Sequence, residues 1–374
     1  MDNKPLRIAQ IMGKMNRGGV ESVVMNYYRA IDKTRIQFDF FVDEDSEFPQ
    51  REELENAGAR IYILPPYSKI LAWQKRLYQL LCQNHYSVVH CQINTMNFFP
   101  LLTAWRAQIP VRICHNHSTA HWGEHKKTLM KYILRPLTKR VATDWFACGE
   151  KAAYWMYGKK ALHSGKVTIM PNAINTKHFV FDPVQRKSLR QKLGISENAM
   201  VVGHVGRYTY AKNHVFLVQA FACLHQKVPG ARLLLIGTGE CAPQIHDTLQ
   251  QLNLKDSVIE TGAQEDPAPY YSAMDVFCMP SFYEGLPVVA LEAQASGLPG
   301  VFSEAVTREV FVTDQVKSLS LEQGPERWAE CMCELVQQKN DRIHAQEAVA
   351  KAGFECRQAA EWLADFYEQK AMRG

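Results

Sequence analysis

Short apolar runs recur along this chain, and stretches with helical periodicity separate them. Most of the runs are apolar at successive positions, which indicates strands buried on both faces, as in parallel sheets covered by helices. The runs are residues 6–12, 38–42, 60–64, 88–91, 111–114, 145–148 and 167–170 in the first half, and 201–205, 232–236, 258–261, 276–278, 300–302 and 318–321 in the second. This pattern predicts an α/β protein made of doubly wound, Rossmann-like sheets.

The length of 374 residues exceeds one typical hydrophobic core, so two domains are expected. The boundary is placed after Pro171-Asn172-Ala173-Ile174-Asn175, which gives domains of 1–175 and 176–352. The remainder, 353–374, is predicted to be a terminal helix that packs on another element. Its apolar stripe consists of Ala359, Trp362, Leu363, Phe366 and Tyr367.

Composition favours a soluble globular protein, with 47% hydrophobic and 22% charged residues. No apolar run approaches 18 residues, and the start, 1–5, lacks the pattern of a signal peptide. The ten cysteines are scattered, and Cys331 and Cys333 have no second pair nearby that could complete a zinc site. A reducing, cytoplasmic location is therefore expected.

Charge is distributed unevenly. Residues 1–180 hold 25 Lys and Arg against 14 Asp and Glu, whereas the remainder holds 18 against 24. Within the basic half, 125–141 combines cations with Leu129, Tyr132, Ile133 and Leu137 at helical spacing. Such a helix can lie on anionic lipid, which predicts peripheral contact with the inner face of a membrane. The alternative is a solvated basic face over a buried stripe. Nucleic acid is not expected, because no binding motif is present.

Two glutamates, Glu284 and Glu292, flank the expected start of a helix after the run at 276–279. Helix-start amides and the positive end of the helix dipole suit a phosphate. Glu292, two turns along on the same face as Glu284, can accept hydrogen bonds from ribose hydroxyls. The candidate contacts for a sugar nucleotide between them are Gly285, Leu286, Pro287 and Val288.

Two further strand ends carry candidate ligand contacts. Gly18 and Gly19 stand before a helix after the first strand, where a ligand can approach the backbone, although the dinucleotide fingerprint is absent. Gly206, Arg207 and Lys212 follow the first strand of the second half. Two cations at this edge can neutralise a diphosphate, and the alternative is a pair of solvated surface charges.

Three histidines, His90, His115 and His117, lie at the ends of two strands in the first half. Period-two spacing places His115 and His117 on one side of a continuing strand. They can serve a ligand or be neutral structural histidines, and a metal site of three histidines is disfavoured for want of a carboxylate partner. A second turn, 237–240, is interpreted as a tight turn rather than a phosphate site.

Taken together, these motifs resemble retaining glycosyltransferases of family 4, the glycosyl transferases group 1, over nearly the whole chain. The residues on which the resemblance rests are 18–21, 171–174, 206–207 with 212–213, 275–277 with 280–281, 284–287 with 292–293, and 297–299. The stretch 303–328 and the histidine pair resemble the subgroup found in capsule and exopolysaccharide clusters. The sequence departs from the family in Asn172-Ala173-Ile174-Asn175 and in Pro267-Ala268-Pro269.

The resemblance implies a GT-B fold, in which two Rossmann-like domains face each other across a cleft and the terminal helix crosses back onto the first domain. It implies that Arg207 and Lys212 bind the diphosphate, that Glu284 contacts donor-sugar hydroxyls and that Glu292 contacts the ribose. Gly18 and Gly19 would line the cleft. His117 would lie by the donor sugar, with His115 as its partner.

The implied reaction transfers a hexose from a nucleotide diphosphate sugar, expected to be a UDP-sugar, to a lipid-linked oligosaccharide. The anomeric configuration would be retained, and no cofactor or metal is expected, because side-chain cations would replace a divalent ion. Alternatives are an epimerase or hydrolase on the same fold and a sugar-nucleotide sensor without turnover. A dinucleotide-dependent oxidoreductase is disfavoured by the missing glycine fingerprint.

Overall fold

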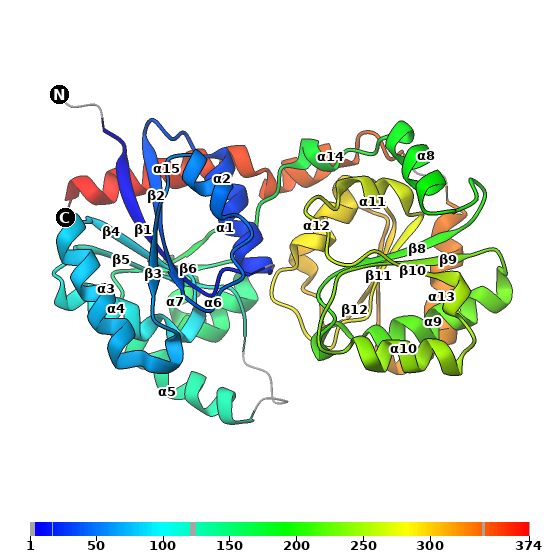
Figure 1. Ribbon diagram of the computed structural model, residues 1–374, viewed down its shortest axis with the longest axis horizontal. Coiled ribbons are helices and arrows are strands. Elements are labelled where there is room, and N and C mark those ends of the chain that lie inside the picture. Colours follow the sequence, from blue (N-terminus) through cyan, green and yellow to red (C-terminus); the bar gives the residue numbers. More distant parts are fainter. Residues whose placement is uncertain (1–3, 17, 120–124, 339–340, 374) are drawn as a thin grey trace. The chain divides into compact units, whose positions relative to one another are not determined.

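The computed structural model describes residues 4–16, 18–119, 125–338 and 341–373, with the backbone alone for 125–128. The chain forms two compact units, Met1–Ala173 together with Cys356–Gly374, and Ile174–Glu355. Each unit has one parallel sheet with helices on both faces (Figure 1). The predicted class, two Rossmann-like α/β domains, is confirmed.

The sheet of the first unit has the strand order β3-β2-β1-β4-β5-β6-β7. Its strands are β1 (Leu6–Gly13), β2 (Ile36–Asp43), β3 (Arg60–Leu64), β4 (Val88–Cys91), β5 (Val111–Asn116), β6 (Asp144–Ala147) and β7 (Val167–Ile169). Its helices are α1 (Gly19–Ala30), α2 (Arg51–Asn56), α3 (Ile70–Asn84), α4 (Phe98–Arg106), α5 (His125–Val141), α6 (Glu150–Tyr157), α7 (Lys159–His163) and α15 (Cys356–Arg373).

The sheet of the second unit has the order β10-β9-β8-β11-β12-β13. Its strands are β8 (Val201–Val205), β9 (Arg232–Ile236), β10 (Val258–Glu260), β11 (Val276–Met279), β12 (Gly300–Ser303) and β13 (Val316–Leu319). Its helices are α8 (Pro183–Lys192), α9 (His214–Lys227), α10 (Ala242–Gln251), α11 (Ala268–Ala273), α12 (Val288–Ala295), α13 (Gly324–Val336) and α14 (Ala345–Val349).

Each apolar run in the sequence is a strand, with ends displaced by at most two residues from those predicted. The central strands are buried at nearly every position; β2, for example, is buried along its whole length. Burial on both faces removes the polar alternation of a half-exposed strand, which is why the runs are continuous.

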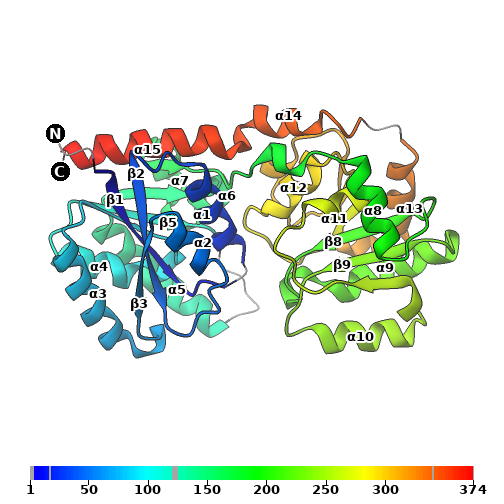
Figure 2. The ribbon, with the colours of Figure 1, turned by 45° about the horizontal axis from the view of Figure 1, so that its top comes forward.

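Helix α15 belongs to the first unit, although it is the last element of the chain (Figures 1 and 2). It packs along α1, and its Tyr367 is fully buried. The ring of Phe366 meets that of Phe146 edge-on, with centroids 4.9 Å apart. Arg35 bridges two carboxylates of the helix, Asp365 and Glu368, at 2.6 Å each. The apolar stripe read from the sequence therefore contributes to the core of the first unit.

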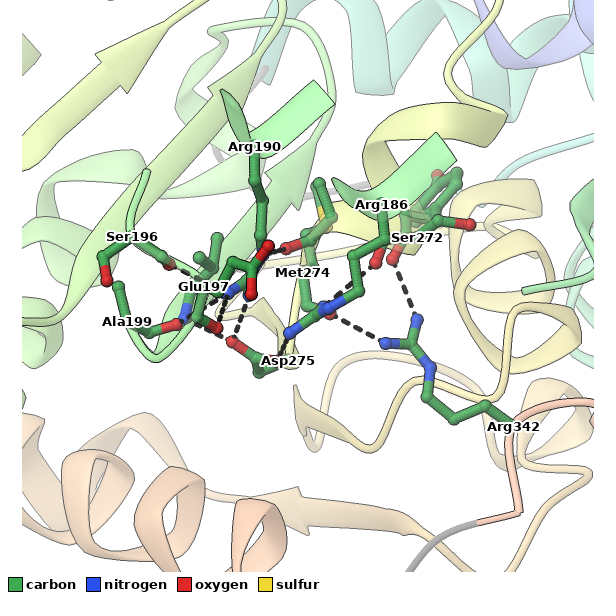
Figure 3. Close-up of polar contacts among 12 residues, drawn as sticks. Arg186, Arg190, Ser196, Glu197, Ala199, Ser272, Met274, Asp275 and Arg342 are labelled. Carbon is green, nitrogen blue, oxygen red and sulfur yellow. Dashed lines mark hydrogen bonds and ion pairs between the residues drawn. The ribbon is translucent and has the colours of Figure 1, made fainter. Parts of the chain in front are cut away.

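At the amino end of the second sheet, Asp275 joins three elements (Figure 3). One carboxylate oxygen accepts from Arg186 at 2.6 Å, and the other accepts from Arg190 at 2.6 Å and from the backbone N–H of Val201 at 2.7 Å. Arg190 is almost completely buried, and its remaining bonds go to carbonyl groups, among them that of Ala199. The carboxylate thus holds α8 against the first residues of β8 and β11.

Arg342 extends this cluster from the segment before α14 (Figure 3). It donates to the carbonyls of Met274, Tyr271 and Ser296, and its guanidinium lies 4.1 Å from the centre of the Phe181 ring. Burial lowers the pKa of Arg342 to about 9, and the positive charge of nearby Arg186 adds to this lowering.

Replacing Asp275 with Asn should destabilise the second unit, because Arg190 would keep a buried charge without its counter-ion. Breaking a buried pair costs about 3–5 kcal/mol, so we expect the midpoint of urea denaturation to fall clearly. The matched control is Lys187→Ala, a residue of α8 like Arg190. It breaks the exposed 3.8 Å pair with Glu197 and should change stability by less than about 0.5 kcal/mol. Equal midpoints for the two variants would contradict this role of Asp275.

Candidate functional site

In the second unit, two loops at the carboxyl end of the sheet are tied together. The loop after β8 contains Lys212, and the loop after β11 contains Glu284; Lys212 Nζ lies 2.7 Å from Glu284 Oε1. The backbone N–H of Phe282 donates to the carbonyl of Ala211 at 2.8 Å, and the Phe282 and Tyr210 rings stack at 4.7 Å. The structure therefore places Glu284 beside Lys212, although 72 residues separate them in the chain.

Asn213 fixes the shape of the first of these loops. Its backbone is left-handed, with φ of 53°, and its side-chain amide donates to the carbonyl of Pro280 at 3.1 Å. Asparagine tolerates this conformation better than most residues. The turn starts α9 directly after Lys212, so the lysine is held at the edge of the sheet with little freedom.

Helix α12 begins at Val288, with no side-chain cap on its amides. Glu284 lies in the loop before this helix, so the prediction that Glu284 and Glu292 share a helical face was wrong. The side chains of Leu286 and Val288 are buried. The carboxylate of Glu284 is positioned by Lys212 and not by helical periodicity.

Glu292 lies inside α12 and is only 7% exposed. Its Oε2 accepts a hydrogen bond from the Tyr271 hydroxyl at 2.7 Å. Burial raises the pKa of Glu292 to about 7, and the Tyr271 hydrogen bond opposes that rise. A buried carboxyl with one donor in place retains acceptor sites for further hydroxyl groups.

Three glycines bring neighbouring strand ends into backbone contact. A side chain on Gly237 would place its Cβ 2.0 Å from the carbonyl oxygen of Gly206, and one on Gly239 would lie 2.4 Å from that of Tyr208. A Cβ on Gly206 would lie 3.1 Å from His204 Nε2 and 3.4 Å from Lys212. These glycines therefore allow the turn at 237–240 to support the cationic loop, in agreement with its interpretation as a structural turn.

Beneath that loop lie two buried histidines that the sequence analysis did not single out. His204 Nδ1 donates to the carbonyl of Cys278 at 2.7 Å, which leaves Nε2 as an acceptor. The ring of His214 lies 4.7 Å from that of His204 and 4.6 Å from that of Tyr208. Burial lowers the pKa of His204 to about 4 and that of His214 to about 2, so both are neutral near pH 7.

In the first unit, Gly18 and Gly19 begin α1. Gly18 is extended, and a Cβ there would lie 2.5 Å from a carboxylate oxygen of Glu21. A Cβ on Gly19 would meet nothing within 4 Å. The Glu21 carboxylate is the end of a flexible side chain, so a side chain at Gly18 would displace it, whereas Gly19 leaves open space at the first turn of the helix.

His90, His115 and His117 form one buried group in the first unit. The rings of His115 and His117 are 4.0 Å apart, as the period-two spacing predicted, and His90 Nε2 lies 3.3 Å from His115 Nδ1. Burial lowers the pKa of His90 and of His117 to about 3, and it lowers that of His115 as well. His117 Nε2 lies 2.8 Å from Gln92 Oε1.

The predicted site residues thus form two sets, one in each unit. Gly18, Gly19, His115 and His117 belong to the first; the second set comprises Gly206, Arg207, Lys212, Glu284, Gly285, Leu286, Pro287, Val288 and Glu292. Sequence reasoning missed Tyr271, His204 and His214. Their spacing from the motifs is not periodic, so only their positions beside strand ends could have indicated them. Within the described ranges, no group of three His, Cys, Asp or Glu side chains could hold a metal ion.

Comparison with known proteins identifies the family. The model of the glycosyl transferases group 1 matches 199–338, and that of glycosyltransferase family 4 matches 17–178. EpsF of Bacillus subtilis (strain 168), named as a glycosyltransferase, is 32% identical over 98% of this chain and 97% of its own length. The chain belongs to glycosyltransferase family 4. It is therefore a transferase, as its motifs predict.

Two more comparisons relate this glycosyltransferase to a capsule enzyme and to a solved structure. The capsular polysaccharide biosynthesis glycosyltransferase CapH of Staphylococcus aureus is 22% identical over 89% of this chain and 92% of CapH. The Anabaena protein Alr3699/HepE, solved in complex with UDP-glucose, superimposes with a TM-score of 0.80 at 19% identity, covering 97% of this chain and all of HepE. The second comparison confirms the GT-B fold, and the first confirms the predicted relation to capsule enzymes.

The buried histidines should make this family 4 glycosyltransferase sensitive to acid. Their pKa values are lowered by folding, so the unfolded chain takes up more protons below pH 6.5 and stability falls as pH decreases from 7 to 5. Each histidine should cost up to about 2 kcal/mol at pH 5. Glu292 has the opposite effect, because its raised pKa makes stability fall as pH rises from 4.5 to about 7. The five buried histidines should outweigh this single carboxyl.

Urea denaturation at pH 5 and pH 7 measures this effect. His214→Phe should reduce the loss of stability at pH 5, because neither His214 nitrogen has a hydrogen-bond partner among the described residues. The exposed His163→Gln variant should retain the wild-type dependence. Equal pH dependence in His214→Phe and wild type would show that His214 is not a neutral buried group.

Proposed function

We propose that this enzyme transfers a hexose from a UDP-sugar to a lipid-linked oligosaccharide during capsule or exopolysaccharide synthesis, with retention of the anomeric configuration. The observation that carries the proposal is the contact of 2.7 Å between Lys212 and Glu284. It places a cation for phosphate and a carboxylate for sugar hydroxyls next to each other at the carboxyl end of a doubly wound sheet.

Lys212 has three N–H donors, and Glu284 accepts from it with one oxygen. Two donors of the ammonium and the second carboxylate oxygen can therefore serve a bound nucleotide sugar. Arg207 on the same loop can bind phosphate oxygens bidentately. As the bond to the diphosphate breaks, these cations and the amides at the start of α12 would stabilise charge on the leaving oxygen, at about 3 kcal/mol for each donor.

The same arrangement supports a reaction that needs no divalent metal. Arg207 and Lys212 supply two positive charges, which is what a metal ion would bring to a departing diphosphate. Glu292 is assigned to the ribose, because its buried carboxyl already has one hydrogen bond from Tyr271 and retains further acceptor sites. In the first unit, we assign Gly18 and Gly19 to the acceptor side and His117, with His115, to the hydroxyls of the donor sugar.

Two relatives support the choice of donor and acceptor. The enzyme named UDP-Gal:alpha-D-GlcNAc-diphosphoundecaprenol alpha-1,3-galactosyltransferase from Escherichia coli is 22% identical over 85% of this chain and 84% of its own length. Its name specifies a UDP-hexose and a lipid diphosphate acceptor. The HepE structure contains UDP-glucose on the same fold. Both therefore favour UDP-sugars as the first donors to test, and the first relative favours lipid-linked saccharides as acceptors.

The test is release of nucleotide from UDP-, GDP- and ADP-hexoses, with and without lipid-linked saccharide acceptors. We expect acceptor-stimulated release of UDP, and a fall of about a hundredfold or more in kcat for Glu284→Gln and Lys212→Met, because each removes a group that acts on the transferring sugar or the leaving diphosphate. Lys255→Met, an exposed lysine of the second unit, is the matched control and should be fully active.

Further readouts separate the parts of the proposal. Turnover should persist in EDTA, and the α-configured product should be visible by NMR when the donor is an α-linked sugar. Loss of activity in EDTA would refute metal independence alone. Tight binding of a UDP-sugar without turnover on any acceptor would instead favour a sugar-nucleotide sensor and would refute the transfer reaction.

A lipid-linked acceptor requires access to a membrane, and we propose that α5 provides it. Leu129 is 65% exposed and Ile133 is 58% exposed, one turn apart on a helix that also carries Lys131, Arg135 and Arg140. Apolar side chains beside cations suit the headgroup region of anionic lipid. Among the described residues, no helix is both long and apolar enough to cross a bilayer, so contact through α5 would be peripheral.

Co-sedimentation with vesicles measures this contact. The wild-type protein should bind vesicles that contain anionic phosphatidylglycerol, and binding should weaken with salt. Leu129→Glu with Ile133→Glu should reduce binding by about tenfold or more, because both the apolar insertion and the attraction are lost. Leu71→Glu, which changes an 81% exposed leucine on α3, is the control and should bind normally. Equal binding by all three proteins would exclude α5 as the contact.

A further inference from the structure

A continuous hydrogen-bonded chain of six buried side chains runs through the first unit. It joins three strand-end histidines to two glutamines and to the C-terminal helix. Its members, in order of contact, are His117, Gln92, Gln10, Tyr367, His90 and His115. The chain folds back on itself, because the rings of its two terminal members, His115 and His117, are only 4.0 Å apart.

The hydrogen bonds of this chain run in one direction. His117 Nε2–H donates to Gln92 at 2.8 Å, the Gln92 amide donates to Gln10 at 2.9 Å, and the Gln10 amide donates to the Tyr367 oxygen at 3.2 Å. Among the described residues, His90 Nδ1, 2.6 Å away, is the acceptor within reach of the Tyr367 hydroxyl, so the Tyr367 proton goes to His90 Nδ1 while the oxygen accepts from Gln10.

The direction determines the tautomer of each histidine. His90 accepts at Nδ1, so its proton is on Nε2, and that proton goes to His115 Nδ1 at 3.3 Å. His115 in turn holds its own proton on Nε2. His117 donates through Nε2, so its Nδ1 is a bare lone pair. The two outermost atoms, His115 Nε2 and His117 Nδ1, have no hydrogen-bond partner among the described residues.

Rotating the side-chain amides of both glutamines by half a turn reverses the donor and acceptor of every hydrogen bond in the chain. His117 would then hold its proton on Nδ1, and His115 would present a bare Nε2. In either direction, one of the two unpartnered nitrogens is a donor and the other is an acceptor, and neither can change alone without leaving an unsatisfied group inside the chain. All three histidines are neutral near pH 7, since burial lowers their pKa values.

We propose that Tyr367 of the C-terminal helix is a positioning residue that, with Gln10 and Gln92, couples the tautomers of His115 and His117, so that their two unpartnered nitrogens, both buried, always present one N–H and one lone pair. This pair of functions matches a group that both donates and accepts, such as a sugar hydroxyl. The hydroxyl of Tyr367 is the one link between the glutamine half and the histidine half of the chain. The consequence for catalysis rests on the proposed function, whereas the coupling itself does not.

The test is NMR of the full-length protein labelled with ¹⁵N-histidine, which reads the protonation of each ring nitrogen without a substrate. The wild-type protein should show one tautomer for His90, His115 and His117. Tyr367→Phe keeps the packed ring but removes the hydroxyl, so His90 and His115 should each show a second tautomer. Unchanged tautomers of His90 and His115 in a folded Tyr367→Phe protein would overturn the proposal.

A control variant shows whether the effect is specific to Tyr367, and a second variant tests the proposal if Tyr367→Phe does not fold. Tyr28→Phe removes another buried hydroxyl of the first unit, one that donates to Gln37 at 2.9 Å and is not part of the chain, so it should leave all three tautomers unchanged. If Tyr367→Phe does not fold, Gln10→Leu serves in its place. It releases the Gln92 amide, so a second tautomer should appear at His117, and its absence would overturn the proposal.

Kinetics then connect the coupling to the reaction. In Tyr367→Phe, kcat should fall about tenfold while KM for the nucleotide sugar changes less than about twofold, because the wrong tautomer faces the sugar but the diphosphate contacts remain. Tyr28→Phe should match wild type. Altered tautomers with an unchanged kcat would leave the coupling established and would instead refute the assignment of His115 and His117 to the donor sugar.

Discussion

Parallel strand pairing is the constraint on which the rest of this structure depends, because it gathers all strand ends of one kind at one edge of each sheet. In the second unit, the amino edge is occupied by Asp275 and its arginines, which bind the first residues of β8 and β11 and serve stability. The carboxyl edge holds the loops of Lys212 and Glu284. The same sheet thus separates groups that maintain the fold from groups available for chemistry, as open α/β sheets generally do.

The polar groups at the carboxyl edges reduce stability. Five neutral histidines and the Glu292 carboxyl are buried, and each prefers water in its charged form. A sequence selected for stability alone would place apolar side chains there. Buried titratable groups that oppose stability in this way are candidates for a role in binding.

The sequence predicted the fold well, because burial on both faces leaves a continuous apolar run for the central strands of each sheet. It also indicated Lys212 and Glu284 separately, but not their contact, which depends on how two loops meet. The hydrogen bond between Gln10 and Tyr367 joins residues 357 positions apart, so no local sequence pattern indicates it. The prediction that Glu284 and Glu292 share a helical face was wrong for a physical reason. Pro287 precedes the first helical residue, so helical periodicity applies only from Val288 onward.

The two units differ in the charge state of their candidate groups, and this difference follows the chemistry of a nucleotide sugar. Lys212 and Arg207 in the second unit are cationic side chains, which suit phosphate oxygens. The histidines of the first unit are held neutral by burial, so they interact through directed donors and acceptors instead of net charge. Neutral, oriented groups discriminate between hydroxyl positions, because a missing partner leaves a buried polar atom unsatisfied. On the proposed function, the first unit would contribute to selection of the sugar through tautomer and orientation, and the second unit to binding of the nucleotide through charge.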